Sequence, residues 1–369
     1  MTITGPDIHS MIFSRSAPNI ILSQVSGGPV QIRITHNGAS TTYDINVNPS
    51  TKTCTIALRE ILRALEPNTI AQTIPASASP WIETFPDEIT MEILIDGEVG
   101  GSWRGRFIPG FCKDSDVLQM LLNEQYWWTF RKQTAHTYRF SREYLTTGIE
   151  PYLEGHEIHI VFHFKNNGKK DIIWEPSHDP SAHKETFDVS YRRIRQIADT
   201  MGYADDEIIA YDVYGSTSSG SDRPIGQRFI VAPNNRKVRG FFFRNSLGAF
   251  DTVYSTGEIS RAIESECKTF IASREELEIS NLSHEVIKVD TGYIAAKAEL
   301  NLWYEFLRSA ERYAINSDGS ISRIIVDGSD SEKTLSEAGS LNFRFRMSIE
   351  NEGSDLTKSH LEEFSDEFT

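Results

Sequence analysis

Apolar and polar residues alternate over much of the chain, with the period of two that is typical of strands with one buried face. The first such stretch is residues 30–47, VQIRITHNGASTTYDINV, where the alternation continues on both sides of Asn37-Gly38. An Asn-Gly pair between two alternating segments is a strong signal for a tight hairpin turn. The stretch therefore predicts a β-hairpin with one buried face.

A second hairpin is predicted at residues 156–174, HEIHIVFHFKNNGKKDIIW, where Ile158, Ile160, Phe162 and Phe164 share one strand face before an Asn-Asn-Gly turn. Further strands are predicted in ITMEILIDGEVGGSWRGRFIP, EIIAYDVYG, QRFIVAP, KVRGFFF, AFDTVYS and LNFRFRMSI. This spacing of short strands and turns favours a mainly β fold made of two β-sandwich-like domains.

The expected domain boundary lies in TTGIEPYLEG, near residues 148–155, where Gly, Pro and polar residues combine. The first domain is then residues 1–150, including the aromatic block QYWWTFRKQTAHTYRFSREYL, and the second is residues 156–349. Residues 350–369 contain seven carboxylates and a single lysine, which predicts a solvated acidic tail. Phe364 and Phe368 leave the alternative that the tail docks on a neighbouring subunit.

Two segments have helical rather than strand spacing. IALREILRALEP predicts a short helix in the first domain, ending before Pro67. Late in the second domain, residues 294–312 predict a long amphipathic helix with an apolar stripe. The stripe comprises Ala296, Leu300, Trp303 and Leu307, flanked by Phe306 and Ala310. Plain core packing is the expected role of this stripe, with Trp303 at its centre and Arg308 on the polar face.

Residues 241–258, FFFRNSLGAFDTVYSTGE, predict a hairpin of a different kind. Phe241, Phe242 and Phe243 cannot all lie on one side of a strand, so both faces of the strand must be covered. Asn245 and Gly248 supply a tight turn that admits positive φ, and Phe250 begins the returning strand. The cover comes either from the chain itself or from a neighbouring subunit.

Composition and charge indicate which classes of partner the chain is unsuited to bind. The 369 residues include 39% hydrophobic and 11% aromatic residues, which is enough for a folded protein with sizeable cores. With 52 acidic residues against 37 basic ones, the net charge of −15 disfavours nucleic acid and anionic membranes as partners. Three widely spaced cysteines predict neither disulfides nor a zinc ribbon, and the N-terminal residues do not have the pattern of a signal peptide.

No catalytic, cofactor-binding or metal site is expected from the motifs. His159 and His163 lie in a predicted strand, where residues four apart are separated by about 13 Å, too far for one metal ion. Phosphate-binding glycine loops and nucleophile motifs are not present in the sequence. A glycosidase carboxylate pair stays open, because folding and not sequence spacing brings such residues together.

Four blocks of the chain, quoted in order, are YWWTFRKQTAHTYRFSREYL, TFDVSYRRIRQIA with IIAYDVYG, FFFRNSLGAFDTVYSTGE, and TGYIAAKAELNLWYEFLRSAERY. They resemble, respectively, the aromatic first-domain block, the strands before the turn, the turn, and the late helix of uncharacterised structural proteins of Bacteroidetes phages and prophages. The similar blocks fall within residues 30–346. Ala249 stands where that pattern has a second glycine, and the usual proline of the first-domain block is not evident.

The resemblance implies a virion structural protein of the tail, neck or baseplate region, assembled in the bacterial cytoplasm. It implies a homo-oligomer, ring- or baseplate-forming, that contacts other virion proteins and has no catalytic residues. Two other functions stay open. One is a host-surface or glycan-binding module, such as a receptor-binding protein, in which Trp and Tyr form a stacking platform. The other is a glycoside hydrolase on a β scaffold.

Overall fold

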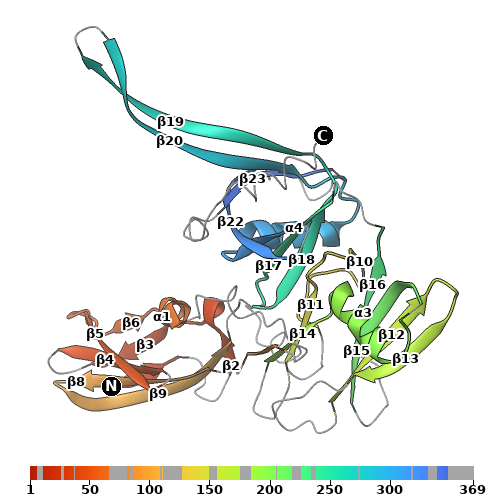
Figure 1. The fold of residues 1–369 in the computed structure, drawn as a ribbon. Coiled ribbons are helices and arrows are strands. Elements are labelled where there is room, and N and C mark those ends of the chain that lie inside the picture. The colour runs from red at the N-terminus through yellow and green to blue at the C-terminus, as the bar shows by residue number, and fades with distance from the viewer. Residues whose placement is uncertain are drawn as a thin grey trace.

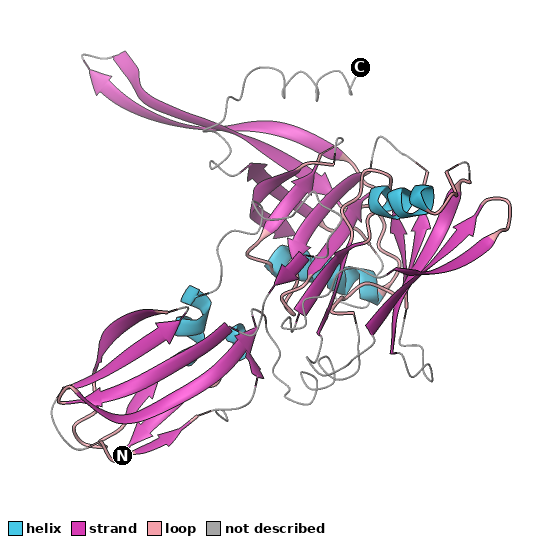
Figure 2. Cartoon of the chain, turned by 60° about the horizontal axis from the view of Figure 1, so that its bottom comes forward, coloured by secondary structure: helices cyan, strands magenta, loops and turns pink. Residues whose placement is uncertain are grey.

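The computed structural model describes residues 1–5, 11–25, 29–36, 38–65, 81–83, 87–108, 110, 127–148, 156–174, 184–204, 206–217, 226–233, 238–272, 275–316, 319–330 and 339–347. Strands dominate these residues and form several mainly antiparallel sheets (Figure 2). The expected mainly β fold is confirmed. Of the helices in these ranges, none has the length and apolar content needed to cross a membrane.

The first core joins a five-stranded sheet, a three-stranded sheet and one short helix (Figure 1). The larger sheet has the order β2 (Met11–Phe13), β9 (Glu98–Ile108), β8 (Asp87–Ile95), β4 (Val30–His36) and β5 (Ala39–Ile45). The smaller sheet has the order β1 (Thr2–Thr4), β3 (Ile20–Ser23) and β6 (Cys54–Ile56). The one-turn 3-10 helix η1 (Ser14–Ser16) lies between β2 and β3 in the chain, and helix α1 (Leu58–Leu65) follows β6. The predicted Asn37-Gly38 hairpin and the predicted short helix are β4–β5 and α1.

The second core again joins a five-stranded and a three-stranded sheet. The larger has the order β10 (Thr134–Thr137), β16 (Gln227–Val231), β15 (Ile208–Thr217), β12 (His156–Phe164) and β13 (Lys169–Trp174). The smaller has the order β11 (Tyr144–Gly148), β14 (Lys184–Asp188) and β7 (Trp81–Glu83), and helix α3 (Tyr191–Thr200) packs into the same core. The second predicted hairpin is β12–β13, and its four predicted apolar residues are all buried.

The third core lies under a seven-stranded sheet. The order is β18 (Phe250–Ser255), β17 (Arg239–Arg244), β21 (Arg312–Ile315), β22 (Ile321–Asp330), β23 (Asn342–Met347), β20 (Glu275–Asp290) and β19 (Ile259–Ala272). Helix α4 (Lys297–Arg308) contributes most of the core residues that do not come from strands. α4 therefore covers one face of this sheet, as the amphipathic stripe predicted.

The expected division into residues 1–150 and 156–349 does not follow the strand pairing. β10 and β11 lie in the aromatic block assigned to the first domain, yet they pair with β16 and β14 of the second core. β7 also pairs with β14, although its sequence precedes β8. Strands on both sides of residues 148–155 therefore belong to the same sheets. The pairings join strands far apart in the sequence, and a Gly- and Pro-rich loop contains no information about them.

The helices differ from expectation in two places. The stretch compared above with strands, TFDVSYRRIRQIA, continues from β14 into α3, where Ile194, Ile197 and Ala198 are buried at helical spacing. The late helix is shorter than residues 294–312, because Ile294 pairs with Gly339 and β21 begins at Arg312. Its buried residues also differ from the stripe: Leu302 and Phe306 are buried with Leu300 and Trp303, whereas Ala310 is exposed and Leu307 is half-buried.

The predicted hairpin at residues 241–258 is formed by β17 and β18. Phe241 and Phe243 point into the α4 core, and Phe242 points to the other face, where it stacks on Phe250. All are buried, so the chain itself covers both faces of the strand. The alternative that a neighbouring subunit covers β17 is not needed to account for this burial. The turn uses positive φ at Gly248, as expected.

β19 and β20 form a long two-stranded ribbon, residues 259–290, called the arm from here on. The two strands pair with each other from Ile259 to Ala272, whereas β20 pairs with β23 only over Ile287–Asp290. At about 3.3 Å per residue, the part of the arm from Val286 to Glu275 reaches roughly 40 Å beyond this pairing. Figure 1 shows the arm projecting away from the sheets. Phe364 and Phe368, in the predicted tail, lie outside the described residues.

Candidate functional site

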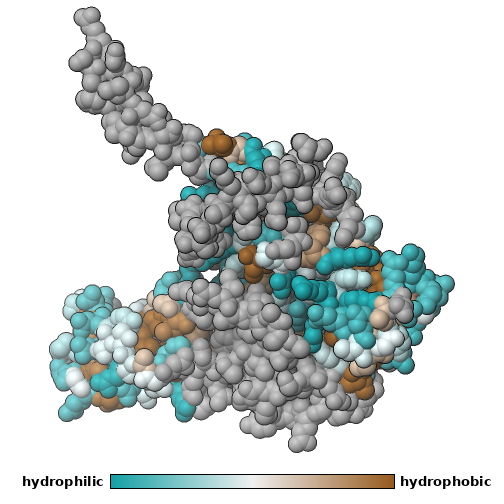
Figure 3. Space-filling model, in the orientation of Figure 1, coloured by the Kyte–Doolittle hydropathy of each residue, from teal (hydrophilic) through white to brown (hydrophobic). Residues whose placement is uncertain are grey.

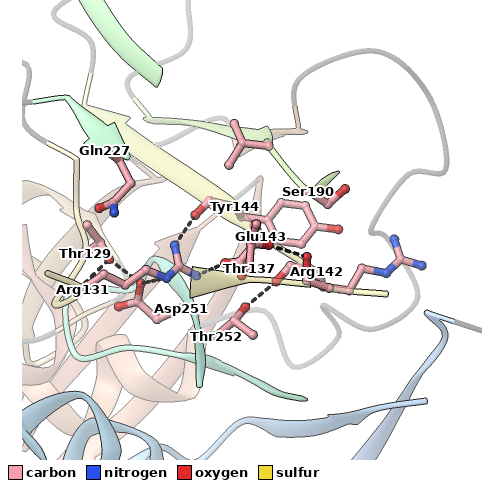
Figure 4. A network of polar contacts seen from close by, with 12 residues as sticks. Thr129, Arg131, Thr137, Arg142, Glu143, Tyr144, Ser190, Gln227, Asp251 and Thr252 are labelled. Atoms are coloured by element: carbon pink, nitrogen blue, oxygen red, sulfur yellow. Dashed lines mark hydrogen bonds and ion pairs between the residues drawn. The ribbon is translucent and has the colours of Figure 1, made fainter. Parts of the chain in front are cut away.

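The most concentrated group of buried polar side chains lies where residues 127–148 cross the β17–β18 hairpin (Figure 4). Its centre is Arg131, which faces two carboxyl groups, Glu143 and Asp251. The side chain of Arg131 is 2% exposed, that of Glu143 is 1% exposed and that of Asp251 is 0% exposed. We call these three residues the buried triad. They come from the aromatic block and from β18.

Asp251 is held in place by donors from two segments. The Thr129 hydroxyl donates to Asp251 Oδ1, and the Phe130 N–H donates to Oδ2 at 3.2 Å. The Asn245 amide donates to Oδ2 at 2.8 Å, and it also donates to the Trp128 carbonyl at 2.9 Å. Asn245 thus links its own hairpin turn to the aromatic block.

Arg131 and Glu143 complete the triad. Arg131 Nη2 lies 2.9 Å from Glu143 Oε2, although the two atoms do not have the alignment of a hydrogen bond. Arg131 Nη1 donates to the Tyr144 carbonyl at 3.0 Å, and the Tyr254 hydroxyl donates to Glu143. The Arg131 guanidinium also lies 5.9 Å from the centre of the Phe229 ring, in the second core. The triad therefore joins the second core to the third.

The turn at residues 245–249 is fastened from the other side as well. Arg244 forms an ion pair with Glu311 at 2.9 Å and donates to the Gly248 carbonyl at 2.6 Å. The Ser246 N–H donates to Glu305 of α4 at 2.9 Å. These contacts give the turn a fixed shape that does not depend on a second glycine at position 249, where Ala249 is buried and its N–H is bonded to Asn245 Oδ1.

The first core meets the others at the same place. The rings of Phe13 and Trp128 pack edge to face with centroids 6.1 Å apart, and both side chains are buried. Gly110 lies so close to the turn that a Cβ there would come within 2.9 Å of the Leu247 backbone. The hairpin turn is thus the point at which the three cores touch.

Charge balance explains the main electrostatic feature of the site. One buried guanidinium faces two carboxyl groups, so with both ionised the buried set would be negative. Burial raises the pKa of Glu143 to about 7, and the charge of Arg131 offsets only part of this effect. A proton on Glu143 makes the set neutral, which is the favourable state for a charge cluster away from water.

Because Glu143 has a higher pKa in the folded state than its value of 4.5 without burial, the folded state binds more protons between those values. This difference in proton binding contributes to the free energy of unfolding in full below pH 4.5. The contribution is lost as the pH rises to about 7, so that the free energy of unfolding falls by roughly 3 kcal/mol in total. We expect Glu143→Gln, which cannot ionise, to remove this loss. The stability of the wild type relative to the variant should therefore fall as the pH rises.

Denaturant unfolding of both proteins between pH 4.5 and 7.5 measures this difference. Glu92→Gln is the matched control, since Glu92 forms a half-exposed ion pair with Arg33, and its effect should stay within about 1 kcal/mol throughout. A wild-type and Glu143→Gln pair whose stability difference is constant with pH would mean that Glu143 does not titrate in this range.

The triad resembles a catalytic acid–base pair in composition, but a substrate cannot reach it. A raised pKa beside a second carboxyl group is a property of glycosidase acids. Such residues must reach the substrate, whereas Glu143 and Asp251 are enclosed and already bonded to protein groups. The arrangement is suited to holding three segments together, and we assign it that structural role.

The predicted site residues lie around the triad rather than in an accessible pocket. Asn245 and Gly248 form the turn, Phe242 and Phe250 pack beside Tyr144, and Phe241 and Phe243 pack against α4 with Trp303. Arg308 is exposed, and its guanidinium lies 5.9 Å from the centre of the Tyr304 ring. The predicted residues thus divide into a buried set and one exposed arginine.

The sequence analysis missed Arg131, Glu143 and Asp251, which are brought together from positions up to 120 residues apart. A weak signal existed, since each follows or precedes an aromatic residue in a run that predicts a buried strand: TFRKQ, SREYL and AFDTV. A charge in such a run needs a buried partner. Which residue is the partner cannot be read from one sequence.

The histidines of β12 occupy separate positions, as the strand assignment predicted. His159 stacks on Tyr214 and lies 3.4 Å from Asp171, whereas His163 Nε2 lies 2.9 Å from Asp212. Within the described part of the chain, no group of three or more His, Cys, Asp or Glu side chains is placed to hold a metal ion. That result concerns only those residues.

Comparison with known proteins adds no assignment: no family model and no curated protein matches this chain.

Proposed function

We propose that the chain is a structural protein of a phage virion, a ring- or baseplate-forming component of the tail or neck. It acts by assembly with further copies of itself and with other virion proteins. The arm is the observation that carries this proposal. The blocks of sequence quoted above supply the virion context, and the fold supplies the means of assembly.

The arm is hard to explain in a chain that acts alone. A two-stranded ribbon is at best marginally stable in water, and a third strand or a packed face is normally required. Beyond Ile287 the described residues offer β19 and β20 no further strand partner, and Ile263 at the root of the arm is 77% exposed. A neighbouring molecule that packs along the arm would supply the missing contacts.

The alternatives have less support. A stacking platform for glycans needs several exposed aromatic rings side by side. Among the side chains that the structure describes, the large exposed aromatics are Tyr43 in β5 of the first core and Tyr293 in the loop between β20 and α4. The buried carboxyl groups of the triad are closed to a polysaccharide. Assembly is the function that the arm and the enclosed cores support together.

Shortening the arm tests the proposal. Glu264 and His284 lie opposite each other, so residues 265–283 can be replaced by Asn-Gly to close the ribbon at that pair. We expect the shortened chain to keep its melting temperature within about 2 °C, because the third core is untouched. We expect it to lose the assemblies larger than a dimer that the wild type forms in sedimentation velocity and negative-stain electron microscopy.

The matched control is Ser273→Asn with Arg274→Gly, which introduces the same two residues and keeps the full length of the arm. It should assemble as the wild type does. Assemblies larger than a dimer, formed by the shortened chain at wild-type concentrations, would show that the arm does not mediate assembly.

A further inference from the structure

A second unpartnered feature lies at the edge of the first core. β5 is the outer strand of the sheet β2-β9-β8-β4-β5 and pairs only with β4 among the described strands. It pairs over its whole length, from Ala39 to Ile45, without a bulge. Its sequence, ASTTYDI, contains one charged residue, Asp44, and no proline or lysine. Long, regular and nearly uncharged edges attract another strand.

The other sheet edges are short, charged or covered. β13 carries Lys169, Lys170 and Asp171. The surface at the right of Figure 3 is largely hydrophilic. β19 carries Arg261 and Glu264, and β18 is contacted by β11. The remaining edges, β1, β2, β6, β7, β10 and β11, have three to five residues each. The edge of β5 is thus the exception to the ways in which this chain protects its sheets.

At β5, the core-facing side of the larger sheet extends beyond the smaller sheet and α1, which cover it elsewhere. Thr41, Tyr43 and Ile45 lie opposite Ile34, Ile32 and Val30, which are buried in the first core. Tyr43 is nevertheless 53% exposed, because the smaller sheet and α1 do not extend over it. A strand added beside β5 would extend the sheet and cover this ring.

We infer that β5 pairs with β5 of a second copy of this chain, antiparallel, about a two-fold axis at Thr42. This register places Thr42 opposite the partner copy's Thr42, Thr41 opposite its Tyr43, and Ser40 opposite its Asp44. The closing pair of a two-residue hairpin is hydrogen-bonded, so His36 and Ala39 fix the pattern of the ladder. The N–H and C=O groups of Ser40, Thr42 and Asp44 then point outward, where a second β5 in this register meets them with about six hydrogen bonds.

The charges on β5 do not oppose pairing with a second copy. Two chains of net charge −15 repel, but charges more than about 8 Å apart are largely screened at physiological salt. In the self-paired register no two charges face each other, since each Asp44 lies opposite a serine. Asp44 also accepts a hydrogen bond from Gln31 on its own sheet, at 2.8 Å. The self-paired edge is therefore free of the like-charge contacts that destabilise cross-strand pairs.

The inference shares with the proposed function only the premise that the chain assembles, and the two fail separately. Sedimentation velocity of the full chain and of the arm-shortened chain distinguishes them. We expect the arm-shortened chain to remain a dimer, with the β5 contact intact. A monomeric arm-shortened chain would show that β5 does not pair with a second copy and would overturn the inference.

Thr42→Lys tests the axis directly, because it places two lysines opposite each other. We expect it to raise the dimer dissociation constant of the arm-shortened chain about tenfold or more. Thr55→Lys, on an exposed position of β6 in the same core, is the matched control and should leave the constant unchanged. An equal mixture of the Thr42→Lys and Thr42→Glu chains should restore the dimer, since opposite charges then meet at the axis. Equal association by the wild type and Thr42→Lys, or failure of the mixture to recover, would overturn the inference.

Discussion

Replacing Arg131 by methionine is expected to lower the free energy of unfolding by about 3–5 kcal/mol. The change leaves two carboxyl groups enclosed without the guanidinium that lies between them. Glu143 can take up a proton, whereas Asp251 is left with only the donors from Thr129, Phe130 and Asn245. Removing one partner from a buried ionic group costs far more than the group as a whole contributes.

The same reasoning predicts partial recovery in a triple variant, Arg131→Met with Glu143→Gln and Asp251→Asn. Every member is then neutral, so no unpaired charge stays buried, and the donors around position 251 still find an acceptor oxygen. Equilibrium denaturation should place the triple variant above Arg131→Met in stability. Arg33→Met, which breaks the half-exposed pair with Glu92, should cost no more than about 1 kcal/mol. A similar small effect of Arg131→Met would show that the triad does not hold the cores together.

The features that sequence predicted well are those decided by neighbouring residues. The hairpins β4–β5 and β12–β13 combine alternation with a turn that Asn or Gly can form, and β17–β18 has such a turn without the alternation. The three phenylalanines of β17 predicted cover on both faces, because successive strand residues point to opposite sides. Local geometry alone is enough for these elements.

The features that sequence missed depend on distant pairings. β10 and β11 join strands that come about 40 to 90 residues later, and nothing in the aromatic block specifies those partners. α3 was missed because its apolar residues are few, and Arg192, Arg193 and Arg195 interrupt the pattern. The triad depends on the same long-range crossing. The strand pairing across residues 148–155 and the buried triad were therefore not predicted, for the same reason.

The buried residues of β17 and β18 differ from the arm and the β5 edge in what they can contact. The predicted interface residues of β17 and β18 are enclosed by α4, Tyr144 and the triad, so they hold one molecule together. The arm and the β5 edge expose what an assembly contact needs: unpaired backbone edges on strands that reach beyond their cores. Rigid cores that fix the direction of two such edges are suited to building a symmetric assembly.

Trp303→Ala is expected to cost about 3–5 kcal/mol, as a large-to-small change in a closed core. Trp303 is 1% exposed, and its ring lies among Phe241, Phe306 and Phe343, with centroids 5.6 to 6.3 Å away. Those rings belong to β17, α4 and β23, so the cavity would open between the helix and the sheet that it covers.

Arg308→Ala is the matched control on the exposed face of the same helix. Its loss of the contact with Tyr304 should change the free energy of unfolding by no more than about 0.5 kcal/mol. Chemical denaturation compares the stabilities of the two variants, and sedimentation measures whether each of them still assembles. If Arg308 contacts another subunit, the Arg308→Ala chain keeps its stability but assembles less well. A near-neutral Trp303→Ala would mean that the α4 core does not stabilise the sheet beneath it, since a closed aromatic core cannot lose its central ring without cost.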